Sequence, residues 1–261
     1  MTISSSSGEA SPPPYSPIRP IEISSRWFPP GRDFGLYESG GVVAPNVTSI
    51  LATEFPFDRS KWEEVEPGID HDRVTQQSAE RGTAVHQAME DWLAHRGAAY
   101  PEEYTAWVEP LRRLVSRAKA TLAVEIPIHH AIEGIGSYAG SADGLVIGVD
   151  GGVVIIDYKT KRPNKRVHPR YQDKQRTQLA AYSIAINAIY ADQLPAPVTR
   201  TSLLYSHPDP GRQPTVITTA GAELEFYQQR WLDLLARWHA ANCHEVQAEQ
   251  EAYASSRRQP T

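Results

Sequence analysis

The feature that most constrains this chain is a pair of apolar, β-forming runs, residues 138–149 and 153–160, which flank a glycine-rich turn. Two such runs in succession predict an antiparallel hairpin. The runs nevertheless contain Asp143, Asp157 and Lys159, where a buried strand favours valine or isoleucine. Buried charges are costly unless they are paired or bind an ion. The hairpin therefore either carries its own ion pair or holds a ligand.

The length of the turn decides which of these charges share a face. Side chains alternate along a strand, so Asp157 and Lys159 point the same way. A two-residue loop at 150–151 would turn Asp143 to the other face. A three-residue loop at 150–152 would pair Asp143 with Lys159 and make Asp157 its diagonal neighbour. Glycine permits the left-handed residue that this loop needs, so we predict the three-residue loop or a bulge of the same parity.

Two interpretations of the charges stay open from the hairpin alone. The first is an Asp–Lys salt bridge at the mouth of the sheet. The second is a metal site, because carboxylates bind hard divalent cations and a neighbouring lysine can orient or deprotonate water.

The segment downstream of the hairpin favours the second interpretation. Residues 159–176 contain eight basic residues and one acid, a net charge of +7, although the whole chain carries −5. A basic segment that leaves directly from an acid-bearing strand is typical of a phosphate-binding rim. The basic residues are Lys159, Lys161, Arg162, Lys165, Arg166, Arg170, Lys174 and Arg176.

The order of the remaining elements predicts an α+β fold, a central mixed sheet flanked by helices. A short helix over 44–55 has Thr48 as its expected N-cap. In the strand over 121–130, Leu122, Val124, Ile126 and Ile128 are expected on one face and Glu125 on the other. Further helices are predicted over 78–97, 102–119, 175–191 and 220–243, and further strands over 200–207 and 213–219.

Composition sets the remaining limits. We expect a disordered Ser/Pro-rich segment over 1–20, one domain over 21–249 and a disordered tail over 250–261. The single cysteine, Cys243, excludes a cysteine-ligated iron–sulfur cluster and is expected to be a buried, inert thiol. The chain has no run apolar enough to cross a membrane and no signal-peptide pattern at its N-terminus, so we expect a cytoplasmic protein without membrane contact.

Four short motifs in this order carry a family resemblance. They are PNVTSIL, RGTAVHQAME, the SADGL and IIDYKTK pair separated by fourteen residues from Asp143 to Asp157, and QLAAY on the following helix. Together they resemble the PD-(D/E)XK nuclease superfamily, and most closely its RecB-like branch, which includes mitochondrial genome maintenance and phage exonucleases. The resemblance spans about residues 45 to 185, and the αβββαβ core of that superfamily agrees with the predicted element order.

The resemblance implies a role for each matching residue. Asp143, Asp157 and His86 would be metal ligands, with the Tyr158 carbonyl completing the site. Lys159 would be the catalytic lysine, and Glu125 resembles the acid in the preceding strand. Gln178 and Tyr182 would touch nucleic acid or orient the lysine; their spacing also places them on one helix face. The basic loop, with Lys161, Arg162, Lys165, Arg166 and Arg170, would contact phosphates.

These residues predict a DNA exonuclease that depends on Mg²⁺ or Mn²⁺, with a preference for single-stranded or end-bearing DNA. Exonuclease rather than endonuclease activity rests on the resemblance alone. Two alternatives stay open. The fold could bind nucleic acid without turnover, or the site could hydrolyse a small phosphoester in an enclosed pocket. Steep salt dependence of binding would favour a polynucleotide.

Overall fold

The structure is a computed structural model that describes residues 16–95, 97, 99–165 and 168–257. Its centre is a five-stranded sheet with the strand order β3-β4-β5-β6-β7. The pairs β3–β4, β4–β5 and β6–β7 are antiparallel and β5–β6 is parallel, which makes the sheet mixed as predicted. The strands are β3 Ala120–Ile132, β4 Gly136–Ile147, β5 Val153–Thr160, β6 Arg200–Ser206 and β7 Thr215–Ala220.

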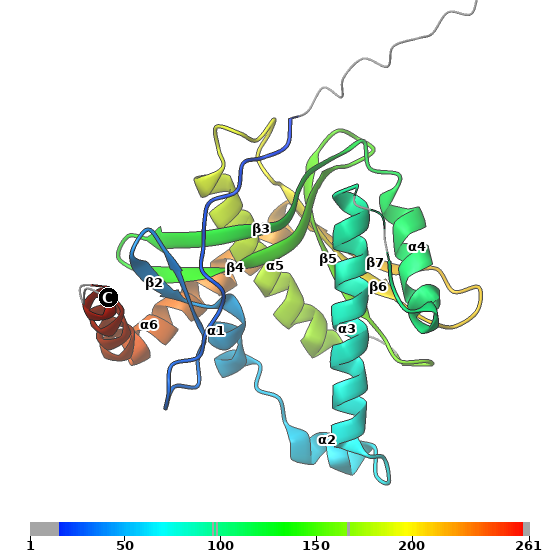
Figure 1. Ribbon diagram of the computed structural model, residues 1–261, viewed down its shortest axis with the longest axis horizontal. Coiled ribbons are helices and arrows are strands. Elements are labelled where there is room, and N and C mark those ends of the chain that lie inside the picture. The colour runs from blue at the N-terminus through cyan, green and yellow to red at the C-terminus, as the bar shows by residue number, and fades with distance from the viewer. Residues whose placement is uncertain (1–15, 96, 98, 166–167, 258–261) are drawn as a thin grey trace, which may run out of the picture.

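Helices cover both faces of this sheet (Figure 1). One face packs against α5 Pro169–Ile189 and α6 Ala222–Ser256, with α1 Val47–Glu54 beside them. The other face packs against α3 His71–Leu93 and α4 Thr105–Val115, the latter preceded by a 3-10 turn at Glu102–Tyr104. This three-layer arrangement confirms the predicted α+β fold with a helix-flanked mixed sheet.

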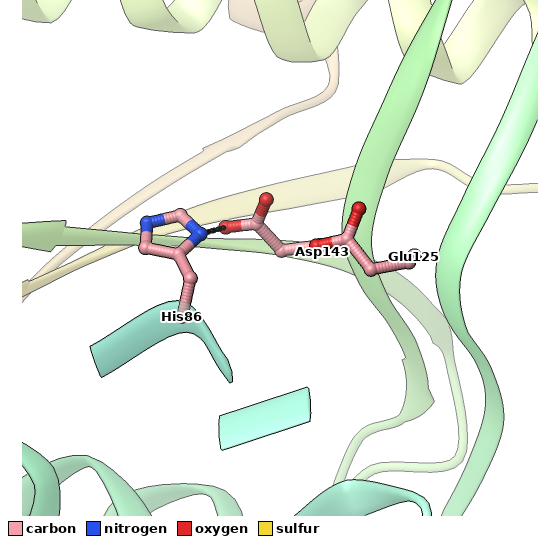
Figure 2. Close-up of side chains that lie close together, drawn as sticks. All are labelled: His86, Glu125 and Asp143. Carbon is pink, nitrogen blue, oxygen red and sulfur yellow. Dashed lines mark ion pairs between the residues drawn. The ribbon is translucent and has the colours of Figure 1, made fainter. Parts of the chain in front are cut away.

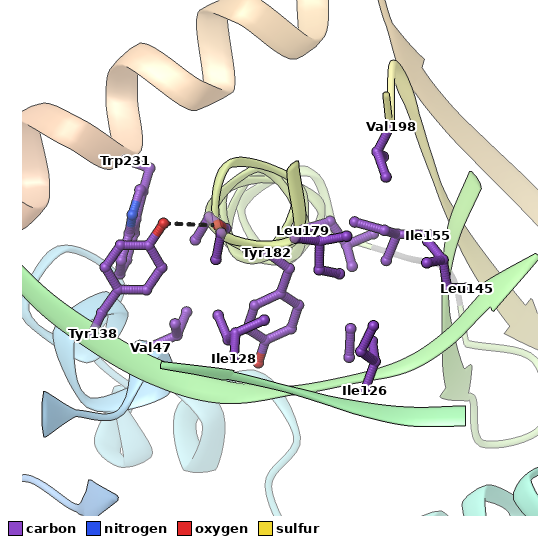
Figure 3. Packing of buried hydrophobic residues seen from close by; sticks show 14 of the residues in the cluster. Val47, Ile126, Ile128, Tyr138, Leu145, Ile155, Leu179, Tyr182, Val198 and Trp231 are labelled. Carbon is purple, nitrogen blue, oxygen red and sulfur yellow. Dashed lines mark hydrogen bonds between the residues drawn. The ribbon is translucent and has the colours of Figure 1, made fainter. Parts of the chain in front are cut away.

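The β4–β5 hairpin is apolar on both faces because it lies between these two helical layers. Leu145 and Ile155 belong to the cluster on the α5 side, which Figure 3 shows together with Tyr138, Tyr182 and Trp231. The alternate residues of the two strands, such as Val146, Val154 and Ile156, pack on the α3 side. Burying one such side chain stabilises the fold by about 1.5–3 kcal/mol, so this hairpin anchors both layers.

The N-terminal part contains two elements that we did not predict. A hairpin of β1 Leu36–Ser39 and β2 Val42–Pro45 turns at Gly40 and Gly41, which both have positive φ. Helix α2, Arg59–Val65, follows α1 and buries none of its residues. The Gly-Gly pair followed by Val42 and Val43 was the available signal for the hairpin, whereas α2, with seven residues, is too short for a helical period to stand out.

Several predicted boundaries are wrong. Helix α1 is capped by Asn46, whose side chain accepts a hydrogen bond from the Ser49 N–H, and not by Thr48. The predicted disordered tail is helical as far as Ser256, and Cys243 on that helix is exposed rather than buried. The predicted disordered N-terminal segment ends early, because Ile18 is buried against the core and its N–H bonds to the Leu122 carbonyl.

The remaining expectations about organisation stay predictions. Residues 1–15 and 258–261 lie outside the described residues, and nothing tests the division into one domain. Within the residues that the structure describes, no helix combines the length and the apolarity that a membrane crossing requires.

Candidate active site

The site begins where the ladder between β4 and β5 stops. The paired residues run from Ile147–Val153 to Gly144–Ile156, and the next backbone groups on β5 have side-chain partners instead. The Tyr158 N–H donates to Oδ2 of Asp143 at 2.8 Å, and the Tyr158 carbonyl lies 2.8 Å from Nε2 of His86. Buried backbone groups need a partner, so these two side chains replace the missing strand pairing.

His86 reaches this opening from α3. Its neighbours Val85 and Met89 hold the helix in the core on the α3 side of the sheet. Nδ1 of His86 lies 3.2 Å from Oδ2 of Asp143. Burial disfavours the charged imidazole, but the adjacent Asp143 carboxylate outweighs this effect and raises the pKa of His86. Conversely, burial alone would raise the pKa of Asp143, and the His86 imidazole lowers it.

Glu125 enters the site through an irregularity in β3. The pairs on either side of it are Val124–Gly144 and Ile126–Ala142, so it stands across from Asp143. Its φ is +46°, an uncommon conformation for a residue with a side chain. The carboxylate accepts a hydrogen bond from Ser141 Oγ at 2.9 Å. Partial desolvation and the negative charge of Asp143 raise the pKa of Glu125.

This irregularity also corrects the predicted facing of β3. Leu122, Ile126 and Ile128 lie on the α5 side, whereas Val124 packs on the α3 side, so the four residues do not share a face. A register shift between Thr121 and Ala123 precedes the left-handed residue. Strict alternation fails wherever a strand contains a bulge or a positive φ.

Three of the side chains can hold one metal ion. His86, Glu125 and Asp143 each offer a ligand atom within 4.8 Å of the others (Figure 2). The predicted ligand Asp157 lies outside this group, and its carboxylate contacts Nζ of Lys159. The Tyr158 carbonyl, also a predicted ligand, is the partner of His86 Nε2. The role of each of these residues toward a metal stays a prediction.

Asp157 and Lys159 form a tight ion pair beside the metal-binding group. The Asp157 side chain is 4% exposed and that of Lys159 is 23% exposed. Burial raises the pKa of Asp157 despite the nearby lysine. Burial would lower the pKa of Lys159, but the carboxylates of Asp157 and Asp143 raise it. The lysine is therefore a cation when no metal or substrate is bound.

The register of the hairpin differs from our prediction. The loop spans residues 148–152 and closes on its own hydrogen bonds, from Gly148 N–H to the Gly152 carbonyl and from Gly151 N–H to the Gly148 carbonyl. Continuing the observed register places Asp143 across from Asp157 instead of Lys159. The predicted three-residue loop at 150–152 is therefore wrong, and the partner of Asp143 lies two residues earlier on β5 than predicted. A shift by two residues keeps each side chain on the same face of the sheet, so all three charges still lie on one face.

Helix α5 brings two further predicted residues to the site. The Gln178 side-chain amide donates to the Tyr182 hydroxyl at 3.0 Å, which confirms that the two share a helix face. The Tyr182 ring lies directly against Gly140 of β4, where a Cβ atom would approach its Cε1 and Oη to 3.1 Å. Burial raises the pKa of Tyr182, and the charges of Asp157 and Asp143 add to this effect. The Gln178 amide is thereby held at the Tyr182 hydroxyl.

The predicted phosphate-binding residues are not equivalent. Arg162 and Lys165 both pair with Glu66, at 2.8 and 2.5 Å, and they lower the pKa of Glu66 to about 2. Lys161 is half-buried with its Nζ over the Tyr205 ring, and burial lowers its pKa. Arg170 reaches the Glu54 carbonyl at 3.4 Å. Arg166 lies outside the described residues.

Sequence reasoning missed Glu66, which neutralises part of the basic loop. This residue ends α2, and 96 positions separate it from Arg162. The acidic stretch around it was the available signal, but ion pairing over such a separation cannot be read from local pattern.

A sequence comparison identifies the class of proteins to which this fold and its acid-bearing hairpin belong. The profile of the PD-(D/E)XK nuclease superfamily matches residues 123–256, just over half of the chain. The match contains Glu125, Asp143, Asp157 and Lys159. The chain belongs to the PD-(D/E)XK nuclease superfamily, as predicted; the RecB-like branch stays a prediction.

Comparisons with individual proteins add little. No curated protein matches the chain. A crystal structure from Eubacterium rectale, described as a candidate exonuclease, has a TM-score of 0.41 and 11% identity, and the match covers 66% of this chain and 68% of that one. The structure of SSO0001 has a TM-score of 0.37 and 15% identity over 74% and 84% of the two chains. Similarity at this level supports no functional argument.

Proposed function

We propose that this protein is a divalent-metal-dependent DNA exonuclease that prefers single-stranded or end-bearing DNA. The observation that carries the proposal is the meeting of His86, Asp143 and Glu125 beside a charged lysine, inside a nuclease fold. The preference for ends and the exonucleolytic mode extend the resemblance to the RecB-like branch.

The chemistry of the donor set fits a divalent cation. One imidazole nitrogen and two carboxylates suit Mg²⁺ or Mn²⁺, and nitrogen ligation makes Mn²⁺ the better tolerated of the two. Burial and, after it, the negative charge of Asp143 raise the pKa of Glu125, and a cation at this position would relieve the repulsion between the two carboxylates. When bound, the cation supplies a Lewis acid for the scissile phosphate and lowers the pKa of a coordinated water.

The protein's own residues orient these groups. The Tyr158 carbonyl accepts a hydrogen bond from Nε2–H of His86, so in the neutral imidazole Nδ1, beside Asp143, is the unprotonated nitrogen that would bind the metal, the arrangement that metal-binding histidines use. The Tyr158 N–H fixes Asp143 in the same way. Lys159 donates hydrogen bonds as an ammonium, so it positions the attacking water and stabilises negative charge on the phosphate.

The basic side chains support DNA as the substrate. Lys161 stands at the end of β5, immediately after the catalytic strand residues, and makes no ion pair within the described part of the chain. Contacts to phosphate give affinity without sequence readout, so we expect cleavage with little sequence preference.

A cleavage assay on end-labelled single- and double-stranded DNA tests this proposal. Wild type and Asp157→Asn would be incubated with Mg²⁺, Mn²⁺ or EDTA. We expect metal-dependent release of label from wild type, faster on single strands, and none from the variant. Binding without cleavage under every metal condition would instead indicate a nucleic-acid-binding module.

A further inference from the structure

Four residues of α5 form a stripe that leads from the acids to the surface. Tyr171, Lys174, Gln178 and Tyr182 are spaced by three or four positions, so their side chains lie on one side of the helix. Tyr182, at the inner end, is 3% exposed, and its pKa is raised by burial and by the charges of Asp157 and Asp143. Tyr171, at the outer end, is 49% exposed.

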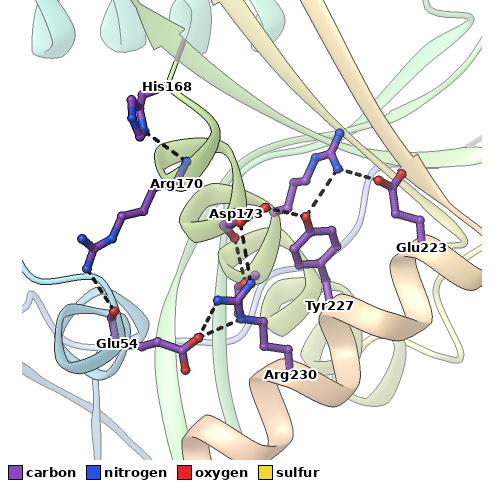
Figure 4. A network of polar contacts seen from close by, with 9 residues as sticks. Glu54, His168, Arg170, Asp173, Glu223, Tyr227 and Arg230 are labelled. Carbon is purple, nitrogen blue, oxygen red and sulfur yellow. Dashed lines mark hydrogen bonds and ion pairs between the residues drawn. The ribbon is translucent and has the colours of Figure 1, made fainter.

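Lys174 is a cation of α5 that no carboxylate neutralises in the described part of the chain. Within the described ranges, it is half-buried and makes no ion pair, and burial lowers its pKa. By contrast, Arg176 on the same helix pairs with Glu223 of α6. Arg230 of α6 pairs with Glu54, as Figure 4 shows. A half-buried ammonium without a counter-ion is costly, and an external phosphate would supply the missing charge.

Tyr171 offers an aromatic surface next to this cation. Its ring contacts His168 edge-on at 6.2 Å between centroids, and almost half of the residue is open to solvent. Exposed aromatic rings beside basic groups bind the bases of single strands by stacking, which a paired duplex does not allow. The seven positions from Tyr171 to Gln178 correspond to about 10 Å along the helix axis, so a base on Tyr171 would belong to a nucleotide near the acids.

We propose that Tyr171, Lys174 and Gln178 form a track for one DNA strand, in which Lys174 binds a backbone phosphate and Tyr171 stacks on a base. This inference rests on the proposed function, because the strand is taken to end at the acids. It assigns the preference for single strands to the face of α5 that points away from α6.

A binding experiment without metal tests the stacking contact. Fluorescence anisotropy in EDTA would compare a labelled single-stranded oligonucleotide and its duplex, using wild type, Tyr171→Ala and Tyr171→Phe. Phe226→Ala is the matched control, since this residue of α6 is 60% exposed and lies off the stripe. We expect Tyr171→Ala to raise the Kd for the single strand about tenfold, with Tyr171→Phe and Phe226→Ala close to wild type and duplex binding unchanged.

The salt dependence of binding tests the phosphate contact. Lys174→Gln and Arg176→Gln remove the same charge from the same helix, but Arg176 is already paired with Glu223. For Lys174→Gln, we expect the slope of log K against log salt to become shallower by about 0.7, the value for one phosphate contact on a single strand. Arg176→Gln should leave the slope unchanged. Melting temperatures would establish that every variant is folded.

Three outcomes would overturn the track. Tyr171→Ala could bind single strands like wild type, Tyr171→Phe could lose as much affinity as Tyr171→Ala, or Lys174→Gln and Arg176→Gln could give the same slope. A different result would contradict the proposed nuclease activity without contradicting the track. If wild type cleaves no DNA with either metal while single-strand binding still depends on Tyr171, the track stands and the nuclease activity does not.

Discussion

The two ends of the β4–β5 hairpin both carry ion pairs, but in opposite surroundings. At the turn, both side-chain oxygens of Asp150 accept hydrogen bonds from Arg200, at 2.7 and 2.8 Å, and the two side chains are 56% and 29% exposed. At the open end, His86 pairs with Asp143 and Lys159 with Asp157, and the two carboxylates are only 13% and 4% exposed.

The two ends of the hairpin differ in the balance of positive and negative charges as well as in burial. The pair at the turn is complete and lies in solvent, where such pairs contribute little to stability. At the open end, Glu125 adds a third carboxylate to the set. Desolvated charge of one sign is unfavourable for the fold, and an incoming cation would balance it. The exposed and complete pair at the turn is therefore an example of a structural ion pair in this chain. The open end differs from it because its charges are buried and include an additional carboxylate.

The largest expected effect comes from Lys159→Met. Removing the ammonium deprives the phosphate of its stabilising charge, so we expect kcat for DNA cleavage to fall by about 10³-fold, with binding in EDTA largely retained. Steady-state cleavage of an end-labelled oligonucleotide measures this. The double variant Asp157→Asn, Lys159→Met removes both members of the buried pair and serves as a folding control. Cleavage at a tenth of the wild-type rate or better would contradict the role of Lys159.

His86→Gln should have a smaller effect that added metal partly reverses. The variant loses one nitrogen ligand, so we expect the Mn²⁺ concentration for half-maximal cleavage to rise by about 10- to 100-fold. A metal titration of the cleavage rate at constant DNA measures this. If the rate falls but its metal dependence keeps the wild-type midpoint, His86 does not bind the metal.

Gly140→Ala tests the packing that holds α5 over the acids. The new Cβ would stand 3.1 Å from the Tyr182 ring, which has to move with Gln178. We expect the free energy of unfolding to fall by about 1–3 kcal/mol and cleavage to fall about tenfold. Chemical denaturation and the cleavage assay check the two parts. Wild-type values of both would show that Tyr182 does not depend on this close approach.

Asp150→Asn should have the smallest effect. It breaks the exposed pair with Arg200, so we expect cleavage within about twofold of wild type and an unchanged metal dependence. The same assays measure both. A loss comparable to that of Lys159→Met would mean that the two ends of the hairpin are not functionally distinct.

Much of this site was predictable because successive side chains of a strand point to opposite faces of the sheet. The alternation in β4 and β5 placed Asp143, Asp157 and Lys159 on one face, and this holds in the structure because the parity of the loop is the predicted one. The pairing was not predictable, since the loop at 148–152 closes on bonds among its own glycines.

Two features of the site lay beyond sequence reasoning. Glu125 has a left-handed conformation inside a strand, and no local pattern indicates this for a glutamate. Glu66, the C-cap of α2, pairs with Arg162 and Lys165, so a segment that reads as uniformly basic is partly paired. An ion pair between segments far apart in the sequence decides the second feature.

The most direct test of the account is a calorimetric titration of Mn²⁺ into the metal-free protein, with Asp143→Asn and Asp150→Asn alongside wild type. The account holds that the charges at the open end of the hairpin bind a cation and that the pair at the turn does not. It predicts one Mn²⁺ site in wild type and in Asp150→Asn, and none in Asp143→Asn. Equal binding by wild type and Asp143→Asn, or no binding by wild type, would contradict it.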